Sequence, residues 1–384
     1  MKIRKVSRHP TFTVCPKFAV RPKFVARPKF VVRPKFAAII LSAVALNLSS
    51  ALPSIAGAPL DPKRFASQFE FVQPEDVGTT FIPAKKANLL NWNVETKQKV
   101  LKCAQAVETK LPGLLSNAAH GTPIRFFRAS VLNEGDTIDG DAVAKPNPLR
   151  ETAAATTPGA MTFSEKYFAQ FESGRDVMFS HEIAHAADMG NRVAYSPAWV
   201  SFMNRNKIKS ARVDSPYVEA LAETVSDWFV GTSIPDKQTF EQKILPMLCE
   251  QSSETTAYLQ NMTAGYVLFK SRKYSDADAK FEAASRNLPE SADPHIRRVS
   301  TLYLARQNSE ALAEADSACQ KLDASEVSYA EPVLQQLLYL RALLQADTGD
   351  YREAVKTADK LLKVNANHKK AKMLKAFCQE RLKS

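Results

Sequence analysis

Apolar residues recur in the first half of the chain at two different spacings, which together predict a mixed α+β domain. Between residues 93 and 111, apolar positions three and four apart alternate with Lys and Glu, so an amphipathic helix is expected there. The short apolar runs 124–129 and 160–163 predict strands. The stretch 133–158 is rich in Asp, Asn, Pro, Gly and Thr and is predicted to be a long loop.

Two further helices are predicted after this loop. The run Val177–Met189 is apolar on nearly every side, which is typical of a buried central helix, and Gly190 is expected to end it. The segment 215–231 opens with a Ser-Pro pair, which is favoured at a helix start, and closes at a glycine. Its apolar residues form one stripe, so this helix is expected to be amphipathic.

From about residue 255 the chain is rich in alanine and shows no strand signal, and an internal repeat is present. A pattern of aromatic and alanine positions that starts at Tyr274 recurs in outline at Asn308 and at Tyr351. The first interval is 34 residues, the tetratricopeptide period, and an insertion near residues 324–331 lengthens the second. The segment therefore resembles three tetratricopeptide repeats, with a generic helical bundle as the alternative.

Small residues support this repeat pattern. Gly265 and Ala342 each stand nine positions before the start of a repeat pattern, where paired helices would cross, and Val299 takes that place in the middle repeat. Residues 368–383 predict a basic amphipathic helix that caps the array.

The first residues of the chain differ from the rest in charge. Residues 1–36 contain eleven Lys and Arg, no acidic residue, and a proline at every sixth position of a hexapeptide repeat, which excludes a regular helix. An apolar run over 37–48 and small residues at 54 and 56 follow, which is typical of a secretory signal peptide. An uncleaved membrane anchor and a basic tail that binds lipid or nucleic acid are the alternatives.

The net charge of +12 is explained by this segment. Of the 52 Lys and Arg, eleven lie in residues 1–36, which leaves 41 against 40 Asp and Glu in the remainder. A nearly neutral body without a basic stripe argues against nucleic-acid binding by the folded part.

Candidate chemistry is concentrated on the predicted buried helix, where His181 and His185 lie four residues apart and Glu182 directly follows the first. Positions i and i+4 share one face of a helix, so both imidazoles can bind one metal ion. Glu182 is the next residue after His181 on this helix, and from there its carboxylate can act as a general base on water at the metal. A metal also gives these polar groups partners in an apolar helix, so we prefer a catalytic zinc site over a structural His pair.

Catalytic zinc sites generally use three protein ligands, so a third is expected downstream. The helix 215–231 offers Glu219, Glu223 and Asp227. Glu219 lies beside the apolar stripe of this helix, Glu223 lies farther from the stripe, and Asp227 lies nearly opposite it. We therefore predict Glu219 as the third ligand and Glu223 as a residue that orients a ligand. Glu223 as the ligand, with Asp227 behind it, is the alternative.

These residues resemble the catalytic domain of anthrax lethal-factor-like zinc proteases, a group that includes the Pro-Pro endopeptidases. The resemblance covers residues 163–231, and its motifs here are His181-Glu182-x-x-His185-Ala186-x-Asp188, Glu219-x-x-Ala222-Glu223 and Trp228-Phe229. It implies that Glu182 is the general base and Glu219 the third ligand. The spacing Glu223-x-x-x-Asp227 also resembles the ligand helix of thermolysin, which keeps Glu223 open as the ligand.

The resemblance carries two further expectations. In the lethal factor a tyrosine seven residues before the third ligand assists the transition state, but this chain has Arg212 there, so the nearer Tyr217 is the candidate. An edge strand before the active-site helix pairs with extended substrate in zincins, and the strand 160–163 is expected in that place.

Cysteine usage agrees with export. Removal of the predicted signal peptide leaves four cysteines: Cys103, Cys249, Cys319 and Cys378. The even count permits disulfides, and Cys103 with Cys249 is the preferred pair, with free buried thiols as the alternative.

The sequence thus predicts a signal peptide (1–56), an α+β zincin-like metallopeptidase domain (57–250) and an all-α tetratricopeptide-like solenoid (255–384). The expected function is that of a Zn²⁺-dependent endopeptidase of the gluzincin type, secreted or in the cell envelope, whose repeats bind a protein partner or substrate. Membrane attachment is expected only if the N-terminal segment stays uncleaved. The alternative is a secreted scaffold with an inactive zincin domain, but a scaffold has no need for Glu182 beside the zinc.

Overall fold

A computed structural model of the chain describes residues 65–77, 88–133, 151–157, 159–210, 216–324 and 331–383. Contacts between residues divide the chain into Met1–Ser54 and the compact unit Ile55–Ser384. The signal peptide predicted over 1–56 lies outside the described residues. Within the described ranges, no helix is both long and apolar enough to cross a membrane.

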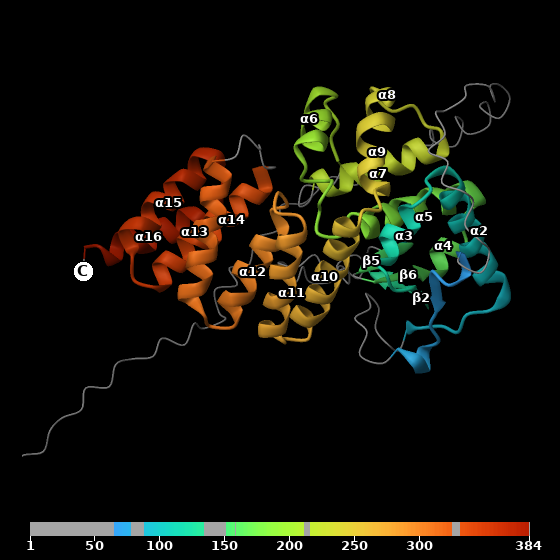
Figure 1. Cartoon of the computed structure of the whole chain (residues 1–384), viewed down its shortest axis with the longest axis horizontal. Coiled ribbons are helices and arrows are strands. Elements are labelled where there is room, and N and C mark those ends of the chain that lie inside the picture. Colours follow the sequence, from blue (N-terminus) through green and yellow to red (C-terminus); the bar gives the residue numbers. More distant parts are fainter. Residues whose placement is uncertain are drawn as a thin grey trace, which may run out of the picture. The chain divides into compact units, whose positions relative to one another are not determined.

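A four-stranded mixed sheet underlies the first half of the compact unit (Figure 1). Its strands, in order across the sheet, are β1 (Phe69–Phe71), β2 (Ile124–Ala129), β6 (Ala160–Ser164) and β5 (Ala154–Thr157). β1, β2 and β6 are parallel, whereas β5 runs antiparallel to β6. Two short strands, β3 (Leu132–Asn133) and β4 (Glu151–Thr152), form a separate antiparallel pair.

The strand predictions for 124–129 and 160–163 are confirmed, but two related predictions are wrong. Residues 154–157, expected within a loop, form β5, and 160–163 is not an edge strand, because β6 lies between β2 and β5. β5 consists of Ala and Thr, whose weak apolar signal resembles a loop in composition. It ends just before Gly159, whose φ of +72° is a conformation that glycine adopts without strain.

Helices pack around the sheet and around one another. They are η2 (Pro74–Asp76), α2 (Val94–Lys110), α3 (Leu114–Ala119), α4 (Glu165–Phe168), α5 (Glu172–Ala187), α6 (Pro197–Arg205), α7 (Pro216–Val230), α8 (Lys237–Thr239), η4 (Phe240–Ile244) and α9 (Leu245–Cys249). The helices predicted at 93–111, around His181 and at 215–231 are therefore confirmed. α2 begins where Asn93 accepts a hydrogen bond from the Thr96 amide at 2.8 Å, which satisfies an otherwise unpaired helix N–H.

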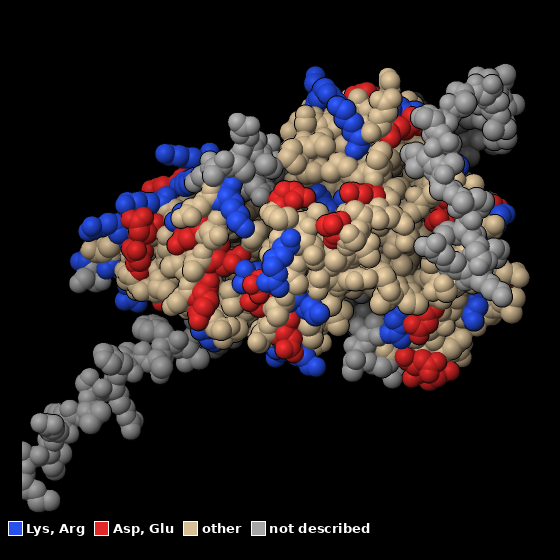
Figure 2. Space-filling view, viewed as in Figure 1, with Lys and Arg blue, Asp and Glu red and all other residues tan. Residues whose placement is uncertain are grey.

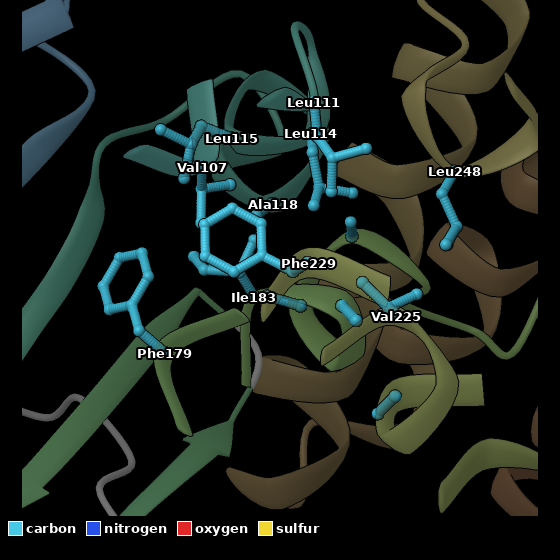
Figure 3. Packing of buried hydrophobic residues seen from close by; sticks show 14 of the residues in the cluster. Val107, Leu111, Leu114, Leu115, Ala118, Phe179, Ile183, Val225, Phe229 and Leu248 are labelled. Carbon is cyan, nitrogen blue, oxygen red and sulfur yellow. The ribbon is translucent and has the colours of Figure 1, made fainter. Parts of the chain in front are cut away.

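The central helix is α5. Its residues Phe179 and Ile183 are fully buried and lie among side chains from α2, α3 and α7, including Val225 and Phe229 of α7 (Figure 3). This burial confirms the expectation from its apolar sequence and ties α5 to both neighbouring helices.

In the second half of the unit, each regular element among the described residues is a helix (Figure 1). They are α10 (Ser253–Lys270), α11 (Tyr274–Asn287), α12 (Asp293–Leu304), α13 (Asn308–Ala324), α14 (Glu331–Asp347), α15 (Tyr351–Val364) and α16 (Lys369–Arg381). Each packs on the next along the chain. Three of these helices begin at Tyr274, Asn308 and Tyr351, where the repeat pattern begins, and α16 lies within the predicted capping helix.

Gly265 allows α10 and α11 to cross closely. A Cβ atom at this position would lie 2.6 Å from Cε1 of Phe281, a ring that is fully buried. The crossing predicted from the small residue is therefore present, and the corresponding Val299 and Ala342 are also buried.

Apolar contacts also join the two halves. Val200 of α6 packs with Ile296 of α12 and Val333 of α14. The domain boundary predicted between residues 250 and 255 stays a prediction.

The predicted disulfide is wrong, because Cys103 and Cys249 both have free thiols. The Cys103 thiol lies in the core, where the Tyr167 hydroxyl donates a hydrogen bond to its Sγ atom at 3.4 Å. Burial raises the pKa of both Cys103 and Cys249 to about 12, so both thiols stay protonated.

Substitution of Gly265 tests the helix crossing. We expect Gly265→Ala to lower the free energy of unfolding by about 1–3 kcal/mol, because the methyl group displaces the Phe281 ring. Gly174→Ala is the control, since its Cβ would meet only Gln170, 3.4 Å away, and the better helix propensity should leave stability equal or about 1 kcal/mol higher. Urea unfolding measures both, and equal effects would contradict the close crossing.

Candidate metal centre

The packing of α5 against α7 brings three potential metal ligands together. His181 and His185 are one turn apart on α5, and Glu219 lies in the first turn of α7. The buried Val225 and Phe229 of α7 lie against the same core as Ile183 of α5, which sets how the two helices face each other (Figure 3).

The donor atoms of this group have the spacing that a metal ion requires. The Nε2 atoms of His181 and His185 are 3.0 Å apart, and the Glu219 carboxylate oxygens lie 3.6 Å and 3.8 Å from them. Ligands about 2.0–2.2 Å from a tetrahedral metal are about 3.3–3.6 Å from one another. His181, His185 and Glu219 can therefore hold a metal ion.

The charges around the site favour a cation. Burial by itself lowers the pKa of His181, but the hydrogen bond to Glu219 and the charges of Glu182, Glu219 and Glu223 outweigh it, so the pKa is raised. The carboxylates that favour a proton on this imidazole favour a metal cation at the same place.

The carboxylates of α7 differ in exposure in the order that helical phase predicts. Glu219 is buried at 6 % exposure, Glu223 is half-buried, and Asp227 is exposed. The Oε1 atom of Glu223 accepts a long hydrogen bond of 3.5 Å from the Ser210 hydroxyl. Burial raises the pKa of Glu223, the charges of Glu219 and Asp227 add to this, and His181 opposes it. The structure thus brings Glu219, rather than Glu223, to the two imidazoles.

Glu182 is held by a threonine that the sequence analysis did not identify. The Thr156 hydroxyl lies 2.7 Å from Oε2 of Glu182 and 3.1 Å from its main-chain carbonyl oxygen, and the shorter distance is to the carboxylate. Thr156 belongs to β5, which was predicted to be loop. The turn dipeptide Pro158-Gly159, placed between a Thr-rich run and a strand, is the sequence signal that could have revealed it.

A cavity of about 540 Å³ opens over His181 and Glu182. Its size lies within the range of small-molecule and peptide side-chain pockets. The lining comes from the start of β5, from α4, from α5 and from α7, and comprises Ala153, Ala154, Lys166, Val177, Met178, His181, Glu182, Glu223, Ser226 and Asp227. A ligand in this cavity therefore lies against His181, one of the three potential metal ligands, and against Glu182.

Tyr217 is partly buried at the start of α7. It packs against the main core and against the apolar cluster of Val200, Ile296 and Val333, and its main-chain oxygen accepts a hydrogen bond of 2.9 Å from the Trp199 indole. It is not part of the lining described for the cavity. Its role in a transition state stays a prediction, and the Arg212 position lies outside the described residues.

The end of α5 is fastened by a buried histidine. Nε2 of His120 lies 2.7 Å from the Ala186 carbonyl oxygen, and its Nδ1 lies 2.6 Å from the Thr263 hydroxyl of α10. Burial lowers the pKa of His120 to about 4, so the ring is neutral near pH 7. Nε2–H then donates to Ala186, and Nδ1 accepts from Thr263. This contact joins His120, α5 and α10, which are far apart in the sequence, and no sequence motif predicts it.

The turn after α5 is held in two ways. The buried Asp188 carboxylate accepts hydrogen bonds from the Val193 and Ala194 amides at 2.6 Å and 3.0 Å. Gly190, with a φ of +77°, lets the Tyr258 hydroxyl of α10 donate to its carbonyl oxygen at 3.2 Å. A Cβ on Gly190 would lie 2.5 Å from that hydroxyl oxygen, so only glycine fits. The helix with both histidines is thus anchored by α10.

The chain matches no protein-family model, no curated protein and no solved structure. Functional inference therefore depends on the arrangement of the side chains just described.

Two glutamate variants test which carboxylate binds the metal. Because only Glu219 faces both imidazoles, Glu219→Ala should abolish stoichiometric Zn²⁺ binding or weaken it severely. Glu223→Ala should bind Zn²⁺ at most about 10–100-fold more weakly. Isothermal titration of the metal-free proteins measures both affinities. The opposite order would assign the ligand to Glu223.

A His120 variant tests whether the buried His120 ring is neutral, through the pH dependence of stability. The folded pKa of about 4 lies below the unfolded value of about 6.5, so only the unfolded state takes up this proton between these pH values. The contribution of His120 is therefore complete above pH 6.5, is lost as the pH falls towards 4, and amounts to about 3 kcal/mol.

His120→Gln removes this titration. Urea unfolding of the metal-free proteins at pH 7.5 and pH 5 should show a steeper acid loss of stability in the wild type than in the variant. Burial raises the pKa of Asp188 to about 7, which acts in the opposite direction, but Asp188 is present in both proteins and cancels. Equal slopes would mean that His120 is not buried as a neutral ring.

Proposed function

We propose that this chain is a zinc-dependent endopeptidase of the gluzincin type. The observation that carries the proposal is the convergence of His181, His185 and Glu219 at a cavity that is lined by His181 and by the hydrogen-bonded Glu182. In this proposal the mixed sheet with α2 to α9 is a zincin-like domain, and α10 to α16 form a tetratricopeptide-like solenoid.

The donor set supports zinc among the common metals. Two imidazole nitrogens and one carboxylate match the composition of catalytic zinc sites, whereas magnesium and calcium prefer oxygen ligands alone. When bound, zinc supplies Lewis-acid polarisation of a peptide carbonyl and lowers the pKa of water.

Glu182 performs the proton transfers in this proposal. Its carboxylate lines the cavity beside His181, where it can take a proton from the attacking water and give it to the leaving amine. Thr156 donates a hydrogen bond to Oε2 and so restrains the carboxylate beside the cavity. A base that is already oriented needs no reorganisation when the substrate arrives.

β5 is the proposed place for the peptide backbone. It is paired with β6 on one side, it forms an edge of the sheet within the described strands, and Thr156 on it touches Glu182. An extended peptide that pairs with β5 would place its scissile bond near Glu182 and the three potential metal ligands. This role was expected for 160–163, but β6 is an inner strand of the sheet, so the proposal uses β5 instead.

Export and partner binding complete the proposal. The basic and apolar residues 1–56 support a signal peptide and hence a secreted or cell-envelope protein. The helical array offers surface for a protein partner or substrate.

Exchange of Glu182 for its amide separates catalysis from metal binding. Glu182→Gln should bind zinc as the wild type does but lose about 100- to 10,000-fold in peptidase turnover, because an amide cannot accept the proton. Glu172→Gln is the matched control, since it makes the same change on α5 at an exposed residue that pairs with Lys102. Digestion of a diverse peptide library, followed by mass spectrometry, measures turnover.

Normal turnover by Glu182→Gln would reject the mechanism. A zinc-loaded wild type that cleaves no peptide in the library would favour the scaffold function, in which the helical array does the work.

A further inference from the structure

The last two helices carry a charge that the proposed peptidase does not use. Residues 351–383 contain ten Lys and Arg but only three Asp and Glu. Residues 37–350, by contrast, contain 31 Lys and Arg and 37 Asp and Glu. The body and this end of the array therefore have opposite net charges. In Figure 2, Lys and Arg side chains are spread over the end where Figure 1 shows α15 and α16.

Part of this charge is compensated and part faces solvent. Lys356 pairs with Glu353 at 2.6 Å, and Lys375 with Asp359 at the same distance. Lys369, Lys370 and Lys372, by contrast, are exposed at the start of α16. The basic charge is thus densest on the terminal helix.

The same helix also exposes large apolar side chains. Among the eight large hydrophobic residues exposed in the described part of the chain, three belong to α16 or its C-cap: Met373 (55 %), Phe377 (45 %) and Leu382 (50 %). α16 already buries another face, with Ala371 and Cys378, against the array. Phe377 also meets the Tyr351 ring of α15, with 6.2 Å between the ring centres, yet both Met373 and Phe377 keep about half of their surface exposed.

The exposed apolar residues lie in line with basic ones. Lys369, Met373, Phe377 and Arg381 are each four residues apart and so form one strip along the helix. The Arg381 guanidinium lies 5.4 Å from the centre of the Phe377 ring. We call these residues, with Lys370 and Lys372, the α16 face.

This combination fits the boundary of an anionic lipid bilayer. Exposed Met and Phe side chains enter the region between headgroups and acyl chains, and each Lys or Arg near the surface is attracted by the anionic headgroups. The long side chains of Lys and Arg reach the headgroups while their stems cover apolar surface. Contacts to a phosphate backbone, by contrast, would leave Met373 and Phe377 in water.

We propose that the α16 face docks this protein on the surface of an anionic phospholipid bilayer. The docking is peripheral, it uses charge attraction and shallow insertion of Met373 and Phe377, and it is independent of the metal centre. It differs from attachment through an uncleaved N-terminal segment, because it lies at the other end of the chain.

Vesicle sedimentation tests the proposal with the compact unit Ile55–Ser384, because the eleven basic residues of 1–36 would themselves bind anionic lipid. This protein should sediment with phosphatidylcholine vesicles that contain phosphatidylglycerol, and not with phosphatidylcholine alone. Added salt should weaken the binding.

Two independent pairs of substitutions locate the surface. Lys369→Glu with Lys372→Glu should weaken binding by about tenfold or more, and Met373→Gln with Phe377→Gln should also weaken it while the charge stays the same. Lys243→Glu with Lys280→Glu is the matched control, since both residues are exposed on other elements and the charge change is equal. Circular dichroism confirms that each protein is folded.

Several results would overturn the proposal. These are equal losses in the control pair and the α16 pair, equal binding to neutral vesicles, or binding to DNA or to an acidic polypeptide without binding to anionic vesicles. If the lysine pair unfolds the protein, the apolar pair decides, because both of its residues are exposed.

Discussion

The packing of α5 on α7 is the contact on which the rest of the site depends. Both helices bury apolar side chains in one core, and this burial fixes their separation and rotation. Glu219 is thereby carried into a nearly dry position beside two imidazoles, where its charge needs a partner. A shift of α7 by about one turn along its axis would present Glu223 instead. Apolar packing between α5 and α7 thus decides which carboxylate lies beside His181 and His185.

The second half of the chain takes part in this arrangement. α10 reaches the end of α5 through Thr263 and His120, and through Tyr258 and Gly190. These are buried polar contacts, so loss of either partner would leave a buried group unsatisfied. The helical array is therefore in direct contact with the segment around α5, which carries the histidines. A change in the position of α10 would act on α5 through these contacts.

The elements that could be predicted are those with a strong local signal. The regular apolar spacing of α2 and the start of α15 at Tyr351 follow from local patterns, and both agree with the structure. β5 could not be recognised, because Ala and Thr carry little apolar signal and its stability comes from pairing with β6. The Cys103 pairing failed for a related reason: an even cysteine count does not tell which way a thiol faces.

The types of the potential metal ligands, their spacing along the helices and the inward side of α7 can be read from the residues, because each depends on positions close along one helix. Tertiary packing is what brings Thr156 to Glu182, His120 to the end of α5, and β5 to the edge beside the cavity. Each of these contacts joins segments far apart in the chain. Such contacts follow from how whole elements pack, which no local pattern of residues encodes.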